Sequence, residues 1–139
     1  MPVVTNETID SFLIELDLPF EELGEGLWRV DNVVDNVPNI IIRHDPPIVL
    51  FRLKVMDVPR KNREELFYKL LELNAQGIAL GAYAIDNGAV ILLDTLRAES
   101  LDLGEFRASI ESISLAATEH YKILAPFVEK EEAAKGEEG

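Results

Sequence analysis

Few residues in this chain could do chemistry, and the densest group of them is Asp31-Asn32-Val33-Val34-Asp35-Asn36. Short carboxylates and amides are ligands that calcium prefers in proteins. Here the polar residues come in pairs separated by two valines, and no glycine follows as an EF-hand loop requires. We therefore interpret the segment as a solvated turn, and we expect neither a metal site nor a cofactor.

The second source of chemistry is a pair of histidines, His44 and His120. His120 falls on an apolar helical stripe, where a histidine is more often a packed core residue than a ligand. No serine stands in the Gly-x-Ser-x-Gly elbow of a hydrolase. These observations predict that the protein is not an enzyme. One catalytic alternative stays open, a group made of Asp31, Asp35 and His44, and it requires the fold to bring the three together.

The charge of the chain narrows the classes of partner. Its 139 residues include 26 acidic and 13 basic side chains, for a net charge of −13. Such a surface repels polyanions at long range, so we expect no nucleic acid and no anionic membrane as a partner. There are no cysteines, which excludes a disulfide scaffold and fits a reducing compartment. No secretory signal is visible at the N-terminus, and we expect a cytoplasmic protein.

Apolar periodicity and turn residues divide the chain into eight elements. They predict helices that begin at Asn6, near Asn62 and near Asp102, the last of them limited by Pro126. They predict strands at residues 27–31, 39–43, 48–56, 79–86 and 89–95. Asn87-Gly88 joins the last two strands, because both residues tolerate the positive φ that a type I′ turn needs.

The order αβββαββα favours an α+β fold, with an antiparallel five-stranded sheet and helices packed on one face. The length suits a single domain, which we place at residues 1–128. The segment 129–139 is rich in Glu, Lys and Gly, and we expect it to be a mobile acidic tail.

Several segments together resemble a known family. They are Leu70-Leu71-Glu72-Leu73-Asn74, then Ala82-Tyr83-Ala84-Ile85-Asp86, then Ala89-Val90-Ile91-Leu92-Leu93, and Leu101-Asp102-Leu103-Gly104-Glu105-Phe106 at the start of the last helix. Over residues 6–128 the chain resembles the bacterial YbjN-like proteins, which have the fold of type III secretion chaperones. The resemblance implies a homodimeric, chaperone-like protein that holds an extended segment of a partner polypeptide, and it carries over no catalytic residue. The alternative that it implies is a regulatory, ligand-sensing domain of sensory transduction.

The predicted strands also suggest where a partner would bind. If helices cover one face of the sheet, the other face carries a mixture of aliphatic and basic side chains that is unusual in so acidic a chain: Leu27, Arg29, Ile48, Leu50, Arg52 and Lys54. An extended apolar peptide could pack on this face or add to a sheet edge. The alternative interpretation is that the Arg and Lys stems merely shield exposed aliphatic groups.

Overall fold

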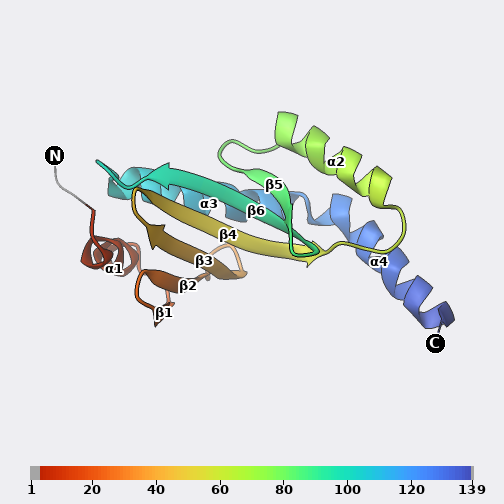
Figure 1. Ribbon diagram of the computed structural model, residues 1–139, viewed down its shortest axis with the longest axis horizontal. Helices are drawn as coiled ribbons and strands as arrows, with labels where there is room; N and C mark the ends of the chain where they lie inside the picture. The colour runs from red at the N-terminus through yellow and green to blue at the C-terminus, as the bar shows by residue number, and fades with distance from the viewer. Residues whose placement is uncertain (1–3, 139) are drawn as a thin grey trace.

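The computed structural model describes residues 4–138, with side chains up to Glu129. The elements follow one another along the chain as the ribbon in Figure 1 shows: α1 (Asn6–Glu15), β1 (Phe20–Gly24), β2 (Leu27–Asn32), β3 (Val37–Asp45), β4 (Ile48–Asp57), α2 (Arg63–Gln76), β5 (Ala82–Asp86), β6 (Ala89–Arg97), α3 (Leu103–Glu119) and α4 (Tyr121–Glu138). The α+β class expected from the sequence is confirmed.

The strands form one antiparallel sheet in the order β1-β2-β3-β4-β6-β5. The sheet therefore has six strands, and the expected number of five is wrong. The missed strand is β1, which pairs with β2 from Phe20↔Val30 onward. All of its residues are exposed, so it lacks the alternation of apolar and polar residues by which a half-buried strand is recognised.

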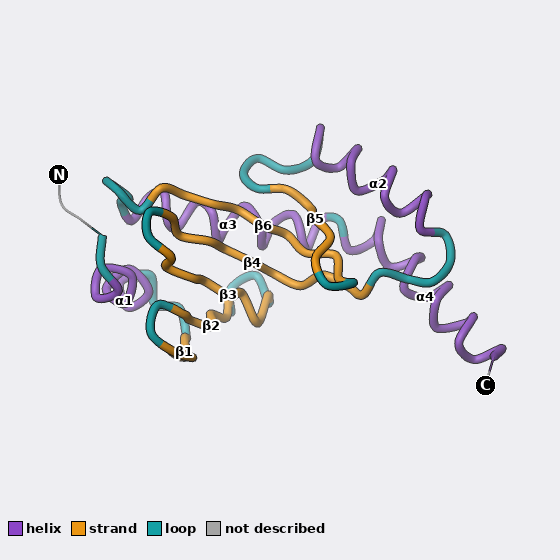
Figure 2. Tube along the Cα trace, in the orientation of Figure 1, coloured by secondary structure: helices purple, strands orange, loops and turns teal. Residues whose placement is uncertain are grey.

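One face of the sheet is covered by helices, as expected. Figure 1 shows α3 running behind β4 and β6, and Figure 2 places α1 beside the β1 end of the sheet and α2 beside its β5 end. Phe106 of α3 is fully buried, and its ring lies 5.3 Å from the rings of both Phe12 and Phe51. Trp28 is also fully buried, and its indole N–H donates to Asp10 Oδ1 at 2.8 Å. These contacts join α1, α3 and the sheet in a single core.

The helix starts follow the sequence in part. Asp102 caps α3 as expected, because its carboxylate accepts from the backbone N–H of Glu105 at 2.8 Å. Helix α1 is capped by Thr5 rather than by Asn6, through a capping box with Thr8. The expected side-chain cap by Asn62 is also wrong, because Asn62 adopts a left-handed conformation with φ of 61° and makes no cap hydrogen bond.

The C-terminal region contains two helices where one was expected. Helix α3 ends at Glu119, with His120 as its C-cap, and α4 then runs through Pro126 as far as Glu138, so Pro126 does not end the helical region. Residues 129–138 thus have a helical backbone, and the mobility of this acidic segment stays a prediction. No helix in the described part of the chain is long and apolar enough to cross a membrane.

The hairpin and the helix before it show how α2 is fixed to the sheet. Asn87 and Gly88 have φ values of 49° and 75°, which confirms the expected turn between β5 and β6. Asn74, in the last turns of α2, makes two hydrogen bonds to the backbone of Tyr83. Its Oδ1 accepts from the N–H at 2.6 Å, and its Nδ2 donates to the carbonyl at 3.2 Å. The asparagine therefore satisfies two backbone groups of the edge strand β5.

We expect Phe106→Ala to reduce the free energy of unfolding by about 3–5 kcal/mol, because it leaves a cavity between Phe12 and Phe51. Denaturant unfolding followed by circular dichroism measures the change. Leu115→Ala on the exposed side of the same helix is the control and should change stability by no more than about 0.5 kcal/mol. A loss at Phe106 no larger than that of the control would contradict the prediction.

Candidate partner-binding surface

The residues of the catalytic alternative do not converge. Asp31 lies at the β2–β3 turn, where its carboxylate accepts from the backbone N–H of Asn39, and Asp35 lies in the same turn. His44 is at the opposite end of the β2–β3 hairpin, where its Nδ1 lies 2.7 Å from Asn6 Oδ1. The fold therefore separates the imidazole from the two carboxylates.

The segment that could have attracted calcium is a structural turn. The Nδ2 of the buried Asn32 donates to Asp35 Oδ2 and to Ser114 Oγ, both at 3.0 Å, so the turn is tied to α3. Among the side chains that the structure describes, up to Glu129, no group of three or more His, Asp or Glu is arranged to hold a metal ion. The polar groups of this turn are used to hold the fold together.

His120 occupies a core position, as its place on the apolar stripe suggested. It is buried, and its Nδ1 lies 2.8 Å from the hydroxyl of Tyr83. Gly77 leaves room for the ring, since a Cβ at that position would lie 2.8 Å from His120 Nε2. Burial raises the pKa of the Tyr83 hydroxyl well above its usual value. The contact between Tyr83 and His120 joins β5 to the end of α3, so the burial of this histidine has a structural explanation.

The uncovered face of the sheet has a regular arrangement of side chains. Residues that pair across antiparallel strands lie on the same face, so the register defines rows of neighbours. One row contains Leu27, Arg43 and Leu50 and the next contains Arg29, Ile41, Arg52 and Leu93. Aliphatic side chains and arginines alternate along both rows. We call these seven residues the checkerboard face.

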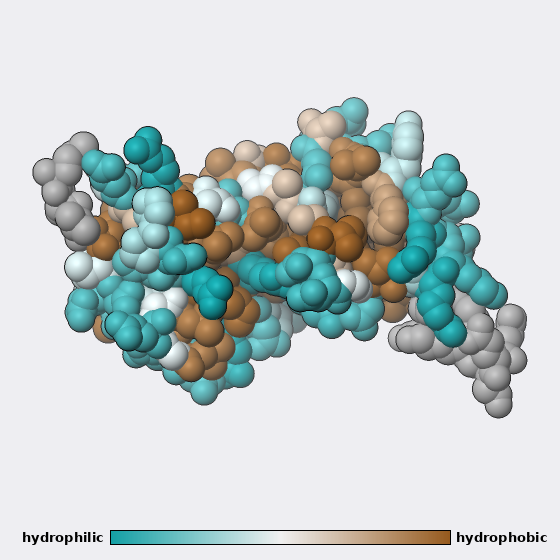
Figure 3. Space-filling view, in the orientation of Figure 1, coloured by the Kyte–Doolittle hydropathy of each residue, from teal (hydrophilic) through white to brown (hydrophobic). Residues whose placement is uncertain are grey.

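The checkerboard face is hollowed at its centre. A cleft of about 330 Å³ is lined by residues from four adjacent strands: Leu27, Ile41, Arg43, Leu50, Arg52 and Leu93. Figure 3, which is drawn from the side opposite α3, shows hydrophobic residues gathered along the middle of this face with hydrophilic residues around them. The surface thus combines a shallow apolar floor with cationic groups at its border.

Ion pairs set the charge of this surface. Arg52 pairs with Asp86 at 2.5 Å, and Arg29 pairs with Glu21 at 2.6 Å. Both arginine side chains remain about two-fifths exposed, at 41% and 43% respectively. Arg43 has no ion-pair partner among the residues whose side chains are described. The net charge of this face is therefore close to zero, whereas the chain as a whole is strongly acidic.

The structure places all six predicted surface residues on this side of the sheet, although not in one cluster. Leu27, Leu50 and Arg52 line the cleft. Arg29 turns to the β1 edge to pair with Glu21. The remaining two, Ile48 and Lys54, lie toward opposite ends of β4, where Lys54 pairs with Asp57 at 2.8 Å.

Sequence reasoning missed three residues of the cleft, namely Ile41, Arg43 and Leu93. Their strands are largely apolar in sequence, so alternation does not reveal which side chains face the helices. The pairing of Arg43 with Leu50 and of Arg52 with Leu93 supplies that information. Cross-strand register was therefore the missing signal.

A second apolar surface lies between α2 and the edge strand β5. A hollow of about 230 Å³ is lined almost entirely by apolar groups, among them Leu70, Tyr83 and Ala84. Three large side chains around it are exposed: Phe67 at 36%, Leu71 at 68% and Ile85 at 47%. Exposed apolar groups gathered in this way are typical of a surface that contacts another protein.

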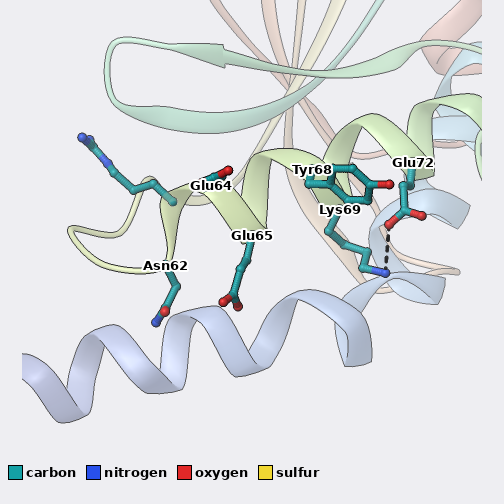
Figure 4. Close-up of a pocket in the computed structure, with 7 residues that line it drawn as sticks. Asn62, Glu64, Glu65, Tyr68, Lys69 and Glu72 are labelled. Atoms are coloured by element: carbon teal, nitrogen blue, oxygen red, sulfur yellow. Dashed lines mark ion pairs between the residues drawn. The ribbon is translucent and has the colours of Figure 1, made fainter.

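The hollow on the other side of α2 has a different character. It measures about 590 Å³, and polar or charged residues form most of its lining. Figure 4 shows Asn62 and Glu65 pointing toward α4 and Lys69 paired with Glu72, whose charged atoms are 3.2 Å apart. With three glutamates and no apolar floor, this cleft does not resemble a binding site for an apolar segment.

Comparisons with known proteins agree with this geometry. A model of the family CesT_Tir_1 matches residues 3–130. The search of curated proteins gave no match. A chain of the heterodimeric ExoU–SpcU complex from the type III secretion system of Pseudomonas aeruginosa superimposes with a TM-score of 0.65 at 19% identity. The match covers 86% of this chain and 96% of that one.

Two further solved structures share the fold. YbjN from E. coli, described as a candidate transcription regulator, has a TM-score of 0.65 at 19% identity, with 87% of this chain and 96% of that chain covered. A chain of the HopA1–SchA chaperone–effector complex has a TM-score of 0.54 at 16% identity, with coverages of 75% and 82%. The resemblance expected from the sequence is confirmed at the level of family and fold.

The buried Tyr83 hydroxyl gives a prediction on pH. The unfolded chain releases this proton near pH 10 and the folded protein releases it at higher pH, so the folded state binds more protons in between. The free energy of unfolding should therefore fall as the pH rises above about 10. Denaturant unfolding at a series of pH values should show a steeper fall for the wild type than for Tyr83→Phe. Equal slopes for the two proteins would contradict the prediction.

Proposed function

The chain belongs to the CesT_Tir_1 family of type III secretion chaperones, and from this premise we propose that it holds an extended segment of a partner polypeptide on the checkerboard face. The observation that carries the proposal is the cleft at the centre of that face, which no helix of the described part of the chain covers. It is formed by side chains from four adjacent strands, so a bound segment can cross several strands. The resulting contact is broad and shallow, as an unfolded segment requires.

The side chains of the checkerboard face suit such a segment. Leu27, Ile41, Leu50 and Leu93 provide apolar contacts, and burial of each aliphatic group that a partner covers favours binding. The arginine stems add apolar area, while their guanidinium groups remain able to donate hydrogen bonds to backbone carbonyls. The acidic surface elsewhere opposes non-specific association and favours solubility.

We further propose that the protein works by binding alone, in the cytoplasm. The acidic and imidazole groups that could have formed a catalytic set lie at separate places and have structural partners. The complexes that share the fold, ExoU–SpcU and HopA1–SchA, are assemblies of two different proteins. This supports a polypeptide partner for the present chain, and affinity capture with mass spectrometry can identify it.

The α2–β5 surface is the place at which we propose that two copies form a homodimer. Strand β5 is at the edge of the sheet, and the exposed Phe67, Leu71 and Ile85 lie beside it. A two-fold axis there would bring the same apolar groups of both copies together, as an isologous interface requires. The checkerboard face would remain free on each copy, because its cleft is centred on β3 and β4.

We expect Leu50→Glu to weaken partner binding by roughly tenfold or more, because it puts an unpaired carboxylate into an apolar cleft. Affinity capture from the cytosol of the source cell, with mass spectrometry, identifies partners of the wild type. Titration with the identified segment then compares the variants. Val34→Glu, at a turn position that is 92% exposed, is the matched control and should bind like the wild type. Retention of full affinity by Leu50→Glu would refute the checkerboard face as the site.

For the dimer, Leu71→Glu should shift the protein toward the monomer, because two buried carboxylates would face each other across the axis. Light scattering after size-exclusion chromatography measures the mass. Ile14→Glu, also 68% exposed but on α1, is the control and should leave the mass unchanged. A wild type that is monomeric at all concentrations would end the dimer proposal and leave the checkerboard proposal standing.

A further inference from the structure

We infer that the sheet has a second peptide site, a slot between the diverging ends of β3 and β4 that takes an extended strand of a partner polypeptide. The recorded pairing of β3 with β4 ends at Ile41↔Arg52. Beyond that pair β4 continues to Asp57, and β3 has already begun at Val37. The two segments therefore diverge, each with one edge toward the slot.

Each of these segments is already paired on its other side. In β4, Leu53 pairs with Leu92 of β6, and the β6 pairing continues to the end of the strand. In β3, Ile40 pairs with Val30 of β2.

The edges toward the slot have no strand partner among the described residues. On the β4 side, an edge of this kind presents backbone N–H and C=O groups at the spacing of an extended chain, about 3.4 Å per residue. On the β3 side, Pro38 carries no N–H and the N–H of Asn39 donates to Asp31 Oδ1, so β4 supplies the donors for a bound strand.

The slot is roomy and mainly apolar. It measures about 800 Å³, which lies within the range of well-formed binding pockets, about 300–1,000 Å³. Its two walls are residues 36–39 and 53–56, and its floor comes from the end of α3 and from α4, with Ala117, Leu124 and Ala125 among the lining residues. Tyr121, also part of the lining, is 70% exposed. An apolar side chain in the slot would remove these groups from water.

The charge of the slot further defines the occupant. Lys54 is the one charged residue among the described residues that line it, although acidic side chains outnumber basic ones two to one in the chain. Its ammonium group pairs with Asp57 and its side chain is still 61% exposed. A strand with apolar residues at alternate positions and a carboxylate close to Lys54 complements both the floor and the charge.

The slot is separate from the checkerboard cleft and rests on the proposed function only in taking a polypeptide as its occupant. The slot and the checkerboard cleft have no lining residue in common, so binding at each can be tested independently. Leu50→Glu should leave slot binding unchanged. Failure of slot binding alone would refute this inference, and failure at the checkerboard face alone would refute the proposed function.

The test uses a heptapeptide in which threonine and valine alternate and the last residue is aspartate. Amide hydrogen exchange, followed by NMR on the full chain, should slow at alternate residues of 53–57 when the peptide is added. The matched control peptide carries N-methyl groups on alternate backbone nitrogens, so it keeps the side chains and loses hydrogen bonds along one edge. It should give no protection.

A protein variant gives a second measurement. Ala117→Trp fills the floor of the slot and should weaken peptide binding by roughly tenfold. Leu115→Trp, on the exposed side of the same helix, should bind like the wild type. Circular dichroism checks whether each variant is folded. If one does not fold, the comparison with the N-methylated peptide still tests the inference, because it uses the wild-type protein.

Four outcomes would overturn the inference. The first is unchanged exchange at residues 53–57 with the peptide present, and the second is equal binding of the N-methylated peptide. The third is protection that appears without peptide and rises with protein concentration, which would make a second copy of the chain the occupant. The fourth is equal protection by decanoate alone, which would make the slot a site for amphipathic acids.

Discussion

The packing of α3 against one face of the sheet is the contact on which the rest of this structure depends. Phe106 lies between Phe12 of α1 and Phe51 of β4, so a single buried ring joins three elements that are distant in sequence. Since α3 covers only one face, the cleft on the other face is lined, among the described residues, by strand residues alone. The same packing that stabilises the domain therefore leaves a surface for a partner.

The exposed face avoids the usual hazard of an uncovered sheet. A continuous apolar face invites aggregation, but here arginines alternate with aliphatic residues along and across the strands. Arginine stems can pack on neighbouring aliphatic groups while their charged ends stay hydrated. A partner segment that makes only shallow contact with each strand can still bury apolar area by crossing four of them. This arrangement supports reversible holding of an unfolded segment rather than tight enclosure of a small ligand.

Backbone edges are the second constraint. Strand β5 ends the sheet on one side, and it is fixed to α2 by the two hydrogen bonds of Asn74. These bonds give a structural role to Asn74 at the end of the leucine-rich helix that precedes the hairpin. Between β3 and β4, the strand pairing of the described residues ends at Ile41↔Arg52 although both strands extend beyond this pair. The checkerboard face, the β5 edge and the β3–β4 slot are the three places at which we propose contact with a polypeptide.

The sequence by itself determined the α+β class, most of the element order, the tight turn at Asn87-Gly88 and the core position of His120. These are local or periodic properties, and short-range sterics and burial record them directly in the residue pattern. It did not reveal β1, whose residues are all exposed, or the helix that continues through Pro126. Three members of the cleft, Ile41, Arg43 and Leu93, depend on cross-strand register, and so does the slot at the end of the β3–β4 pairing. Only the tertiary structure decided these features, because register joins residues far apart in the chain and no local pattern encodes it.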